Sequence, residues 1–412
     1  MSRLEMLSHP SALFMSSSRR VGLWLVGAFG GVGGTTAVGL AALARGLTDP
    51  TGLVTASPRF ARVPFDTPAS FVIGGHDIRQ TSFARAAAEL HQRSGVFSES
   101  LLGAVAGQLD EWSANVRPGV VFKPNPVIAA LADRPDVRRA ETPKQAIDAI
   151  QQDLQAFVAA HRLDQLVVAN VASTEPPFDP TDDHRTLAAL HAGLARGTTL
   201  LPTSSLYAYA AMDAGFPYLN MTPSRGANLP ALDELAKLRG VPHAGQDLKT
   251  GETLLKSALA PMFAKRNLKV LSWVGHNILG NRDGQVLADP ANKASKVQTK
   301  DALLAAMLGY KPQSLVSIEY VESLDDWKTA WDHVHFEGFL GTKMTLQFTW
   351  QGCDSILAAP LVIDLARLAL LAQRRGDAGT LTAAASFFKS PLGVSEHDLG
   401  KQFGLLEEYL QS

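Results

Sequence analysis

The segment Val21–Arg45, VGLWLVGAFGGVGGTTAVGLAALAR, decides the fold class of this 412-residue chain. Its apolar start, Val21–Val26, leads into a glycine cluster, and a stretch rich in small residues follows. Gly27, Gly30 and Gly33 stand in the order G-x-x-G-x-x-G. A strand, a glycine turn and a helix N-terminus bind a pyrophosphate well, because backbone N–H groups approach the phosphates and the helix dipole favours negative charge. The segment therefore predicts a nucleotide site.

The same segment has a second interpretation as a membrane span or an export signal. No charged residue occurs from Val21 to Ala44, and Ser18-Arg19-Arg20 precedes this stretch. Five glycines between residues 27 and 34 argue against a smooth hydrophobic helix, and Val21–Val26 alone is too short to span a bilayer. We therefore expect no membrane partner. We expect residues 1–17 to form a flexible leader.

Composition narrows the class of protein. Hydrophobic residues make up 46% of the chain, as in an ordinary globular protein. The length suggests about two or three domains. A net charge of −1 without a basic stripe argues against a nucleic-acid partner. Cys353 is the single cysteine, so no intrachain disulfide can form, which favours a cytoplasmic location.

Before about residue 230, strand and helix patterns alternate. We expect strands at Thr51–Ala56, Gln165–Val171 and Tyr218–Met221, and helices at Pro143–His161 and Leu206–Ala214. Such alternation predicts a parallel, doubly wound α/β sheet whose ligands lie at the carboxyl ends of the strands.

After residue 230 the pattern changes to a mixed one that looks antiparallel. We expect a helix at Gly251–Lys265 and strands at Val270–Val274, Leu315–Val321 and Met344–Trp350. The apolar helix expected at Pro360–Gln373 would return to the first domain. Lysine usage changes at the same point, since the first 230 residues hold two lysines and the next seventy hold eight. Lysine can shift its pKa and exchange protons, which arginine in practice cannot, so the change also suggests a boundary between domains of different roles.

Four polar loops in the second half are candidates for a ligand site. They cover residues 220–228, 243–253, 272–284 and 295–301. Each loop alone could be a turn built by Asn, Asp and Gly. The four together favour a functional site.

With these loops in view, the chain closely resembles the myo-inositol-1-phosphate synthase family, also called inositol-3-phosphate synthase, and in particular its archaeal and bacterial branch. The matching motifs occur in the same order from about residue 21 to residue 392. They are LVGAFGGVGGTT, GGHDIR (Gly74–Arg79), NVASTEP (Asn170–Pro176), YLNMTPS, VPHAGQDLKTGETLLK, HNILGNRDG, SKVQTKD, GFLG (Gly338–Gly341), APLVIDLARL and FFKSPL (Phe387–Leu392). Arg225 and His276 depart from the family's patterns.

The resemblance implies an isomerase that converts D-glucose 6-phosphate to 1D-myo-inositol 3-phosphate with bound NAD. The steps are oxidation at C5, enolisation, intramolecular aldol cyclisation and re-reduction. The implied fold is a Rossmann domain (residues 18–228) interrupted by an inserted α+β domain for catalysis and tetramer formation (229–353), with residues 354–412 returning to the Rossmann domain. A homotetramer is implied. Whether a divalent metal or a monovalent cation is also required stays open.

The family's motifs also imply the site residues. The catalytic positions are Lys296, Lys300, Lys328, Lys389, Asp247, Asp354 and Asn277. The cofactor positions are Gly27, Ala28, Phe29, Gly30, Gly31, Val32, Gly33, Asn170, Ala172, Ser173 and Thr174. The substrate positions are Thr222, Ser224, Arg225, Gly226 and Lys256. Ammonium groups in a closed site can stabilise the oxyanions of this reaction, and a crowded lysine can transfer protons. We expect Lys389 and Lys328 near C5 and C6, Lys296 and Lys300 near the phosphate and O1, and Asp354 as the partner of Lys389; which lysine is the base stays open.

One feature leaves the choice of cofactor open. A dinucleotide site usually has Asp or Glu about 20 residues after the glycines, at the end of the second strand. The segment Val54–Pro58 contains no acid, and archaeal relatives carry Glu where Ala56 stands. Thr55 and Ser57 could hold the ribose weakly, whereas Arg59 could accept the 2′-phosphate of NADP. Two other functions also stay open: a sugar-phosphate dehydrogenase that releases NADH, and a dinucleotide-binding regulator without catalysis.

Overall fold

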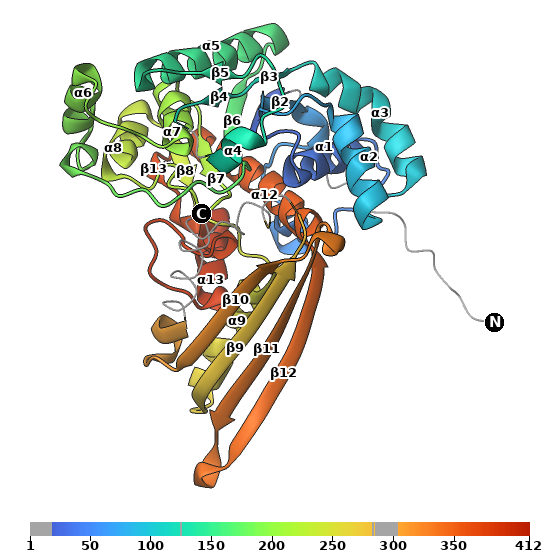
Figure 1. Ribbon diagram of the computed structural model, residues 1–412, viewed down its shortest axis with the longest axis vertical. Helices are drawn as coiled ribbons and strands as arrows, with labels where there is room; N and C mark the ends of the chain where they lie inside the picture. Colours follow the sequence, from blue (N-terminus) through green and yellow to red (C-terminus); the bar gives the residue numbers. More distant parts are fainter. Residues whose placement is uncertain (1–18, 124–125, 282–283, 285–303) are drawn as a thin grey trace.

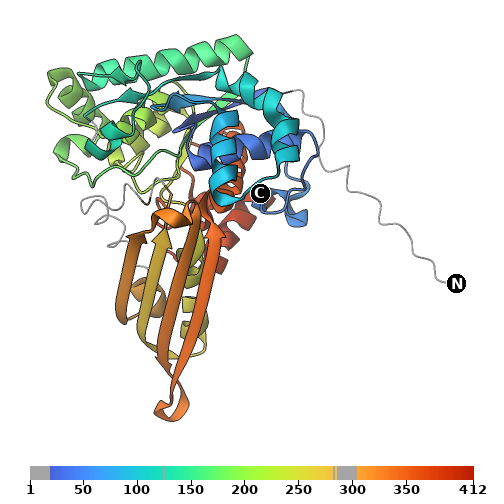
Figure 2. The same ribbon diagram turned by 45° about the vertical axis from the view of Figure 1, so that its right-hand side comes forward.

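The computed structural model describes residues 19–123, 126–281, 284 and 304–412, and these form two connected units (Figure 1). The larger unit is a parallel sheet with helices on both faces. The smaller unit is a four-stranded sheet that projects from it, with helical segments packed against one of its faces (Figure 2). The leader expected at residues 1–17 lies outside the described residues.

The larger sheet has seven strands in the order β13-β8-β7-β6-β1-β2-β3, and every neighbouring pair is parallel. Its strands are β1 (Val21–Val26), β2 (Phe71–Asp77), β3 (Val116–Pro118), β6 (Gln165–Asn170), β7 (Tyr218–Asn220), β8 (Pro242–Ala244) and β13 (Gly379–Thr380). The order runs outward in both directions from β1 and β6, as in a dinucleotide-binding Rossmann fold. A separate parallel pair is formed by β4 (Val120–Val121) and β5 (Arg138–Arg139).

Helices pack on both faces of the seven-stranded sheet (Figure 1). The helices of the larger unit are α1 (Gly31–Ala44), α2 (Phe83–Ser94), α3 (Glu99–Ser113), α4 (Pro126–Ala130), α5 (Pro143–His161), α6 (Leu187–Arg196), α7 (Thr203–Asp213), α8 (Pro230–Arg239), α12 (Asp354–Arg375) and α13 (Leu399–Gln411), of which α13 lies against α9 (Gly251–Lys265) rather than on the sheet. Short 3₁₀ turns are η1 (Val54–Ala56), η2 (Pro58–Phe60), η3 (Pro68–Ser70), η4 (Asp182–His184), η5 (Glu322–Leu324), η6 (Phe339–Gly341) and η7 (Thr382–Phe387).

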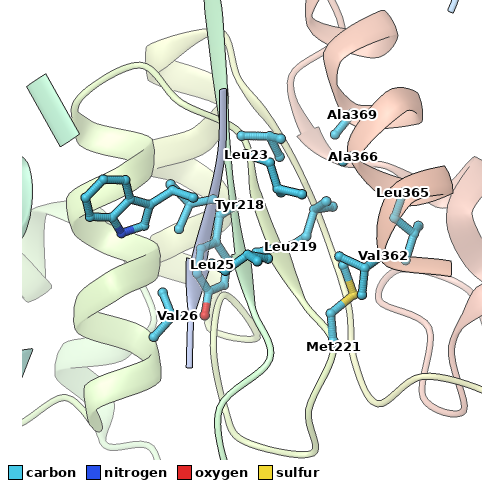
Figure 3. Close-up of a cluster of buried hydrophobic side chains, with 14 of the residues drawn as sticks. Leu23, Leu25, Val26, Tyr218, Leu219, Met221, Val362, Leu365, Ala366 and Ala369 are labelled. Carbon is cyan, nitrogen blue, oxygen red and sulfur yellow. The ribbon is translucent and has the colours of Figure 1, made fainter. Parts of the chain in front are cut away.

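The core of the larger unit follows from side chains that alternate along its strands. Leu23 of β1 and Leu219 of β7 face Val362 and Leu365 of α12 (Figure 3). On the opposite face, the indole ring of Trp24 packs edge-on against Phe157 of α5, with ring centroids 5.2 Å apart. Among the described residues, α12 is the one helix long and apolar enough to cross a membrane, but most of it is buried in this core. Val21–Arg45 forms a strand and a helix rather than one continuous hydrophobic helix.

The smaller unit has its own sheet and its own core. Its strands, in the order β10-β9-β11-β12, are β9 (Lys269–Leu279), β10 (Gln313–Tyr320), β11 (Trp327–Glu337) and β12 (Lys343–Cys353). The β10–β9 pair is parallel and the other two pairs are antiparallel. Helix α9 (Gly251–Lys265) covers one face, where Phe263, Trp273 and Val334 are buried together.

Two expectations about the fold are wrong. Thr51–Ala56 is not a strand, because Thr55 is buried with its backbone N–H and hydroxyl bonded to Asp364 of α12. The strand that follows α1 is β2 instead, after a connection that includes η1, η2 and η3. The expected boundary at residue 229 is also too early, because β8 pairs with β7 in the larger sheet. The smaller unit therefore begins after β8.

Candidate active site

A cavity of about 910 Å³ lies at the carboxyl ends of β1, β2, β6 and β7. Residues from both units line it, including Gly280 and Lys328 from the smaller one. The cavity lies where β1 meets β6, the point at which the strand order reverses. Open parallel sheets bind their ligands at such a point.

The glycine turn forms one wall of the cavity. Gly27, Phe29, Gly30, Gly31 and Val32 all line it. At Gly27 φ is +86°, and a Cβ there would approach the Cα of Ala172 to 2.8 Å, so glycine is required. The N-cap of α1 is Gly30, which has no side chain to cap the helix, and no acid occurs in the first turn. The first N–H groups of α1 are thus suited to bind an anionic ligand.

Two of the expected cofactor residues, Ala28 and Gly33, do not line the cavity and instead pack beneath the glycine turn. Ala28 is buried, and neither Ala28 nor Gly33 is among the residues that line the cavity. A Cβ on Gly33 would lie 2.3 Å from the carbonyl oxygen of Ala28. Gly33 therefore allows α1 to pack closely on the turn, which is the role of the third glycine in dinucleotide sites.

Asp77, which the sequence reasoning missed, occupies the position where such folds carry the ribose-binding acid. It is the last residue of β2, the strand next to β1, and it lines the cavity. Its Oδ2 accepts a hydrogen bond from Phe29 N at 2.6 Å, and its Oδ1 accepts one from Arg79 N at 2.8 Å. Burial raises the pKa of Asp77, although these hydrogen bonds oppose the shift. The sequence feature that could have identified Asp77 is the GGHDIR motif, in which an acidic residue ends an apolar strand.

The residues expected near the ribose have other roles. Among the described residues, those that line the cavity do not include Thr55, Ala56, Ser57 or Arg59. The hydroxyl of Thr55 donates to Asp364 Oδ1 at 2.5 Å, and Arg59 forms an ion pair with Glu407. The cavity therefore gives no support to a ribose site at Ala56.

The end of β6 and the loop after it form the adjoining part of the wall. Asn170, Ala172, Ser173 and Thr174 line the cavity, as expected. Asn170 Nδ2 donates to Asn220 Oδ1 at 3.1 Å, which joins the ends of β6 and β7. Glu175 was missed; it lines the cavity, and its carboxylate accepts a hydrogen bond from Ser204 N at 3.2 Å. Burial raises the pKa of Glu175.

The expected substrate residues divide into two groups. Thr222 and Ser224 line the cavity, whereas Arg225, Gly226 and Lys256 are not among its lining residues. Arg225 Nη2 donates to the carbonyl oxygen of Phe178 at 2.6 Å. Gly226 has φ +52° and packs against the Asn220 side chain. These two residues therefore shape the loop rather than face the cavity.

Lys256 and Asn277 belong to a buried cluster between α9 and β9. Lys256 Nζ lies 2.5 Å from Glu252 Oε1, and Asn277 Nδ2 donates to Glu252 Oε2 at 2.7 Å. All three side chains are buried, and none is among the residues that line the cavity. The cluster connects the helix and the sheet of the smaller unit.

A lysine–carboxylate pair faces the cavity on the side of the C-terminal segment. Lys389 Nζ lies 2.8 Å from Asp247 Oδ1, and both residues line the cavity. The backbone reinforces the pair, because Lys389 N donates to the carbonyl oxygen of Asp247 at 2.7 Å. The expected pairing of Lys389 with Asp354 is wrong. Asp354 lines the cavity separately, as the first residue of α12.

Lys328 lines the cavity at the start of β11, whereas Lys296 and Lys300 lie outside the described residues. Asp326, a further residue that was missed, also lines the cavity. Its carboxylate accepts hydrogen bonds from Ser355 N at 2.8 Å, from Cys353 Sγ at 2.9 Å and from Asn281 Nδ2 at 3.1 Å. Burial and the nearby Asp354 raise the pKa of Asp326, and burial raises the pKa of the Cys353 thiol to about 12.

A family model, related sequences and solved structures all match this chain to inositol-phosphate synthases. The family described as Myo-inositol-1-phosphate synthase, an NAD-binding family, matches residues 21–411. Inositol-3-phosphate synthase 1 of Bacteroides thetaiotaomicron is 32% identical over 95% of each chain. Isozyme 1 of Arabidopsis thaliana is 30% identical over 77% of this chain and 63% of its own length. The crystal structure of inositol-3-phosphate synthase from Caenorhabditis elegans superposes with a TM-score of 0.85 at 25% identity, over 95% of this chain and 85% of that one. A myo-inositol-1-phosphate synthase-related protein from Thermotoga maritima shares the fold, with a TM-score of 0.76 at 24% identity over 95% and 99% of the chains.

Proposed function

This chain belongs to the myo-inositol-1-phosphate synthase family and is an enzyme of that family, and from this premise we propose that it converts D-glucose 6-phosphate to 1D-myo-inositol 3-phosphate. One observation carries the proposal. A single cavity contains the glycine turn at the N-terminus of α1, the Lys389–Asp247 pair, Lys328 and Asp354. These are the groups that a retained redox cofactor and an oxyanion-forming sugar phosphate require.

The cavity suits NAD better than NADP. We place the pyrophosphate at the N-terminus of α1 and the adenosine ribose at Asp77, whose carboxylate would accept hydrogen bonds from the ribose hydroxyls. The same carboxylate would repel the 2′-phosphate of NADP. Bound there, NAD would supply the hydride acceptor for oxidation at C5 and the hydride donor for the final reduction.

The lysines supply charge and proton transfer. We propose that Lys389 and Lys328 lie near C5 and C6. One of them takes the O5 proton during oxidation, and the other, in its neutral form, takes a proton from C6 to form the enolate. The protonated first lysine then stabilises the enolate oxygen. After C6 attacks the C1 aldehyde, the alkoxide on O1 needs a proton, which we assign to Lys296 or Lys300. The hydroxyls of Thr222 and Ser224 are candidates to bind the phosphate. The described residues contain no group of three or more His, Cys, Asp or Glu side chains able to hold a metal, so we assign no step to one.

One experiment separates this proposal from its alternatives. The purified protein is incubated with glucose 6-phosphate and catalytic NAD⁺, and products are followed by phosphorus NMR and by NADH absorbance. Inositol phosphate without net NADH supports the proposal. Stoichiometric NADH without inositol phosphate would show a sugar-phosphate dehydrogenase, and neither product would show a dinucleotide-binding regulator.

We also propose that the chain forms a homotetramer through the smaller unit. Helix α9 covers one face of the four-stranded sheet, while the other face carries the exposed side chains of Leu315 and Trp331. At the β11–β12 turn, Phe339 and Leu340 are 87% and 86% exposed. Exposed apolar side chains gathered on one unit favour a protein contact. Light scattering should give four times the 44.0 kDa chain mass, and a monomer would refute this assembly.

The buried free thiol of Cys353 is compatible with a reducing compartment, and we propose a cytoplasmic location. Fractionation of the source cells tests this, since recovery of the protein outside the cytoplasm would contradict it.

A further inference from the structure

The end of α2 holds the start of β11 through three hydrogen bonds. Arg93 Nε donates to Asp325 Oδ1 at 2.6 Å. Asp326 N donates to Ser94 Oγ at 3.2 Å, and Trp327 Nε1 donates to the carbonyl oxygen of Ser94 at 2.7 Å. We call these three contacts the α2–β11 latch. They connect the two units at the place where the four-stranded sheet meets the α/β unit (Figure 1).

One contact of the latch gives a hydrogen-bond donor to a carbonyl group at the C-terminus of α2. The last carbonyl groups of an α-helix have no partner within the helix. Ser94 is the last residue of α2, and the chain turns away at Gly95 with φ +66°. The indole N–H of Trp327 therefore satisfies a carbonyl group that the helix leaves free. Ser94 is itself buried and lines the cavity, while Trp327 is 38% exposed, so this bond matters for geometry at the cavity wall more than for stability.

The latch residues are followed directly by Lys328, which lines the cavity. Asp326 extends the connection to the other site segments. Its backbone carbonyl accepts from Asp354 N at 2.9 Å, and its carboxylate accepts from Ser355 N and Asn281 Nδ2. The start of β11 is thus fixed on one side by α12 and on the other by α2.

We propose that the latch positions the Lys328 ammonium group in the cavity, and that Ser94 and Trp327 are positioning residues for the reaction. This inference rests on the proposed function. The latch itself adds little stability at its outer end, because the Arg93 and Asp325 side chains are 54% and 20% exposed and such pairs contribute little. Its effect falls on geometry, where a misplacement of about 1 Å can cost up to 10²-fold in rate.

The test removes the two bonds to Ser94 without removing a charge. Trp327→Phe keeps an aromatic ring but loses the indole donor, and Ser94→Ala loses the hydroxyl acceptor. A matched control is Ser257→Ala, a buried serine of α9 whose hydroxyl donates to Leu254 within the same helix. The double variant should lose about tenfold or more in kcat, with KM for glucose 6-phosphate changed by less than about twofold. Its NADH affinity and melting temperature should stay close to those of the Ser257→Ala protein.

Unchanged kcat in the double variant would overturn the proposal, and so would a parallel loss of kcat, NADH affinity and melting temperature. A second measurement does not depend on the reaction. An amine-reactive reagent labels the lysines of the wild type and the double variant, and mass spectrometry gives each labelling rate. The rate at Lys328 should change while that at the exposed Lys269 does not. If the wild type makes no inositol phosphate, the proposed function fails, but an unchanged rate at Lys328 alone refutes the latch.

Discussion

Replacing Lys389 by alanine tests whether this residue takes part in catalysis or only in folding. Lys389 Nζ lies 2.8 Å from Asp247 Oδ1, and the two side chains are 16% and 13% exposed. The substitution removes a cation that we place beside C5 and C6, and it leaves the Asp247 carboxylate without that cation. We expect turnover to fall about 10²-fold or more, the size of effect seen when a positioned proton-transfer or oxyanion group is lost.

The cost in stability should be modest by comparison. Breaking a fully buried ion pair costs about 3–5 kcal/mol, but both of these side chains retain contact with water, so we expect roughly 1–2 kcal/mol. The segment also keeps its backbone hydrogen bonds, from Lys389 N to Asp247 O and from Gln246 N to Ser390 O. The fold and NADH binding should therefore persist in the variant.

The assay compares inositol phosphate formation, NADH titration and urea unfolding for Lys389→Ala, Lys389→Arg and a control. Lys265→Ala is the control, because Lys265 also pairs with an aspartate, Asp398 at 2.9 Å, but is 67% exposed and absent from the described cavity lining. Lys389→Arg should not restore turnover, since guanidinium keeps its proton at neutral pH. Near-normal turnover in the arginine variant would exclude proton transfer, and near-normal turnover in the alanine variant would refute the whole assignment.

Three further predictions follow from the same geometry. Asp77→Ala should weaken NAD⁺ binding and reduce the preference for NAD⁺ over NADP⁺, as measured by fluorescence titration of the reduced cofactors; an unchanged preference would exclude Asp77 from the ribose site. Gly30→Val should abolish cofactor binding while the protein still folds, whereas Gly33→Val should destabilise the fold because its Cβ would lie 2.3 Å from Ala28 O; circular dichroism and NADH titration of both variants distinguish the two effects. Burial raises the pKa of Asp364 to about 6, so its ionised form is disfavoured in the folded protein and stability is lost as pH rises through 6. The difference in unfolding free energy between wild type and Asp364→Asn should therefore change by roughly 2 kcal/mol between pH 4 and pH 7, and a constant difference would contradict the shift.

The sequence correctly predicted those helices and strands that depend on patterns of neighbouring residues. β1 and α9 have the expected bounds, Val21–Val26 and Gly251–Lys265, and α5 begins with a capping box formed by Thr142 and Gln145. The strand expected at Thr51–Ala56 is absent, and Val54–Ala56 forms the short turn η1 instead. Asp364, about 310 positions away, accepts hydrogen bonds from that backbone and holds it in a turn. A contact so distant in sequence leaves no local pattern.

The candidate site also divides into residues that local sequence patterns predicted and residues that they did not. The glycine turn and the Asn170–Thr174 loop line the cavity as expected, because each follows a buried strand whose end is fixed by the sheet. Lys256 and Asn277 do not line the cavity, because both are buried between α9 and β9. Which side chains of the smaller unit reach the cavity depends on which face of its sheet α9 covers, and the sequence does not show this. The second strand of the sheet was expected too early for a related reason. The distance of about 20 residues assumes a short connection after α1, whereas η1, η2 and η3 delay the second strand of this sheet to Phe71–Asp77.

The residues that line the cavity carry too little positive charge to balance the negative charge of the proposed ligands. Carboxylates outnumber cationic side chains among the residues that line it, and Asp77, Glu175 and Asp326 all have raised pKa values because they are buried there. A dinucleotide and a sugar phosphate would add further negative charge to the same cavity, where buried like charges repel. The proposed function therefore calls for more positive charge than Lys123, Lys328, Lys389 and the lining arginines provide. The sequence offers Lys296 and Lys300 for this purpose, which is the physical reason to keep both in the proposed catalytic set.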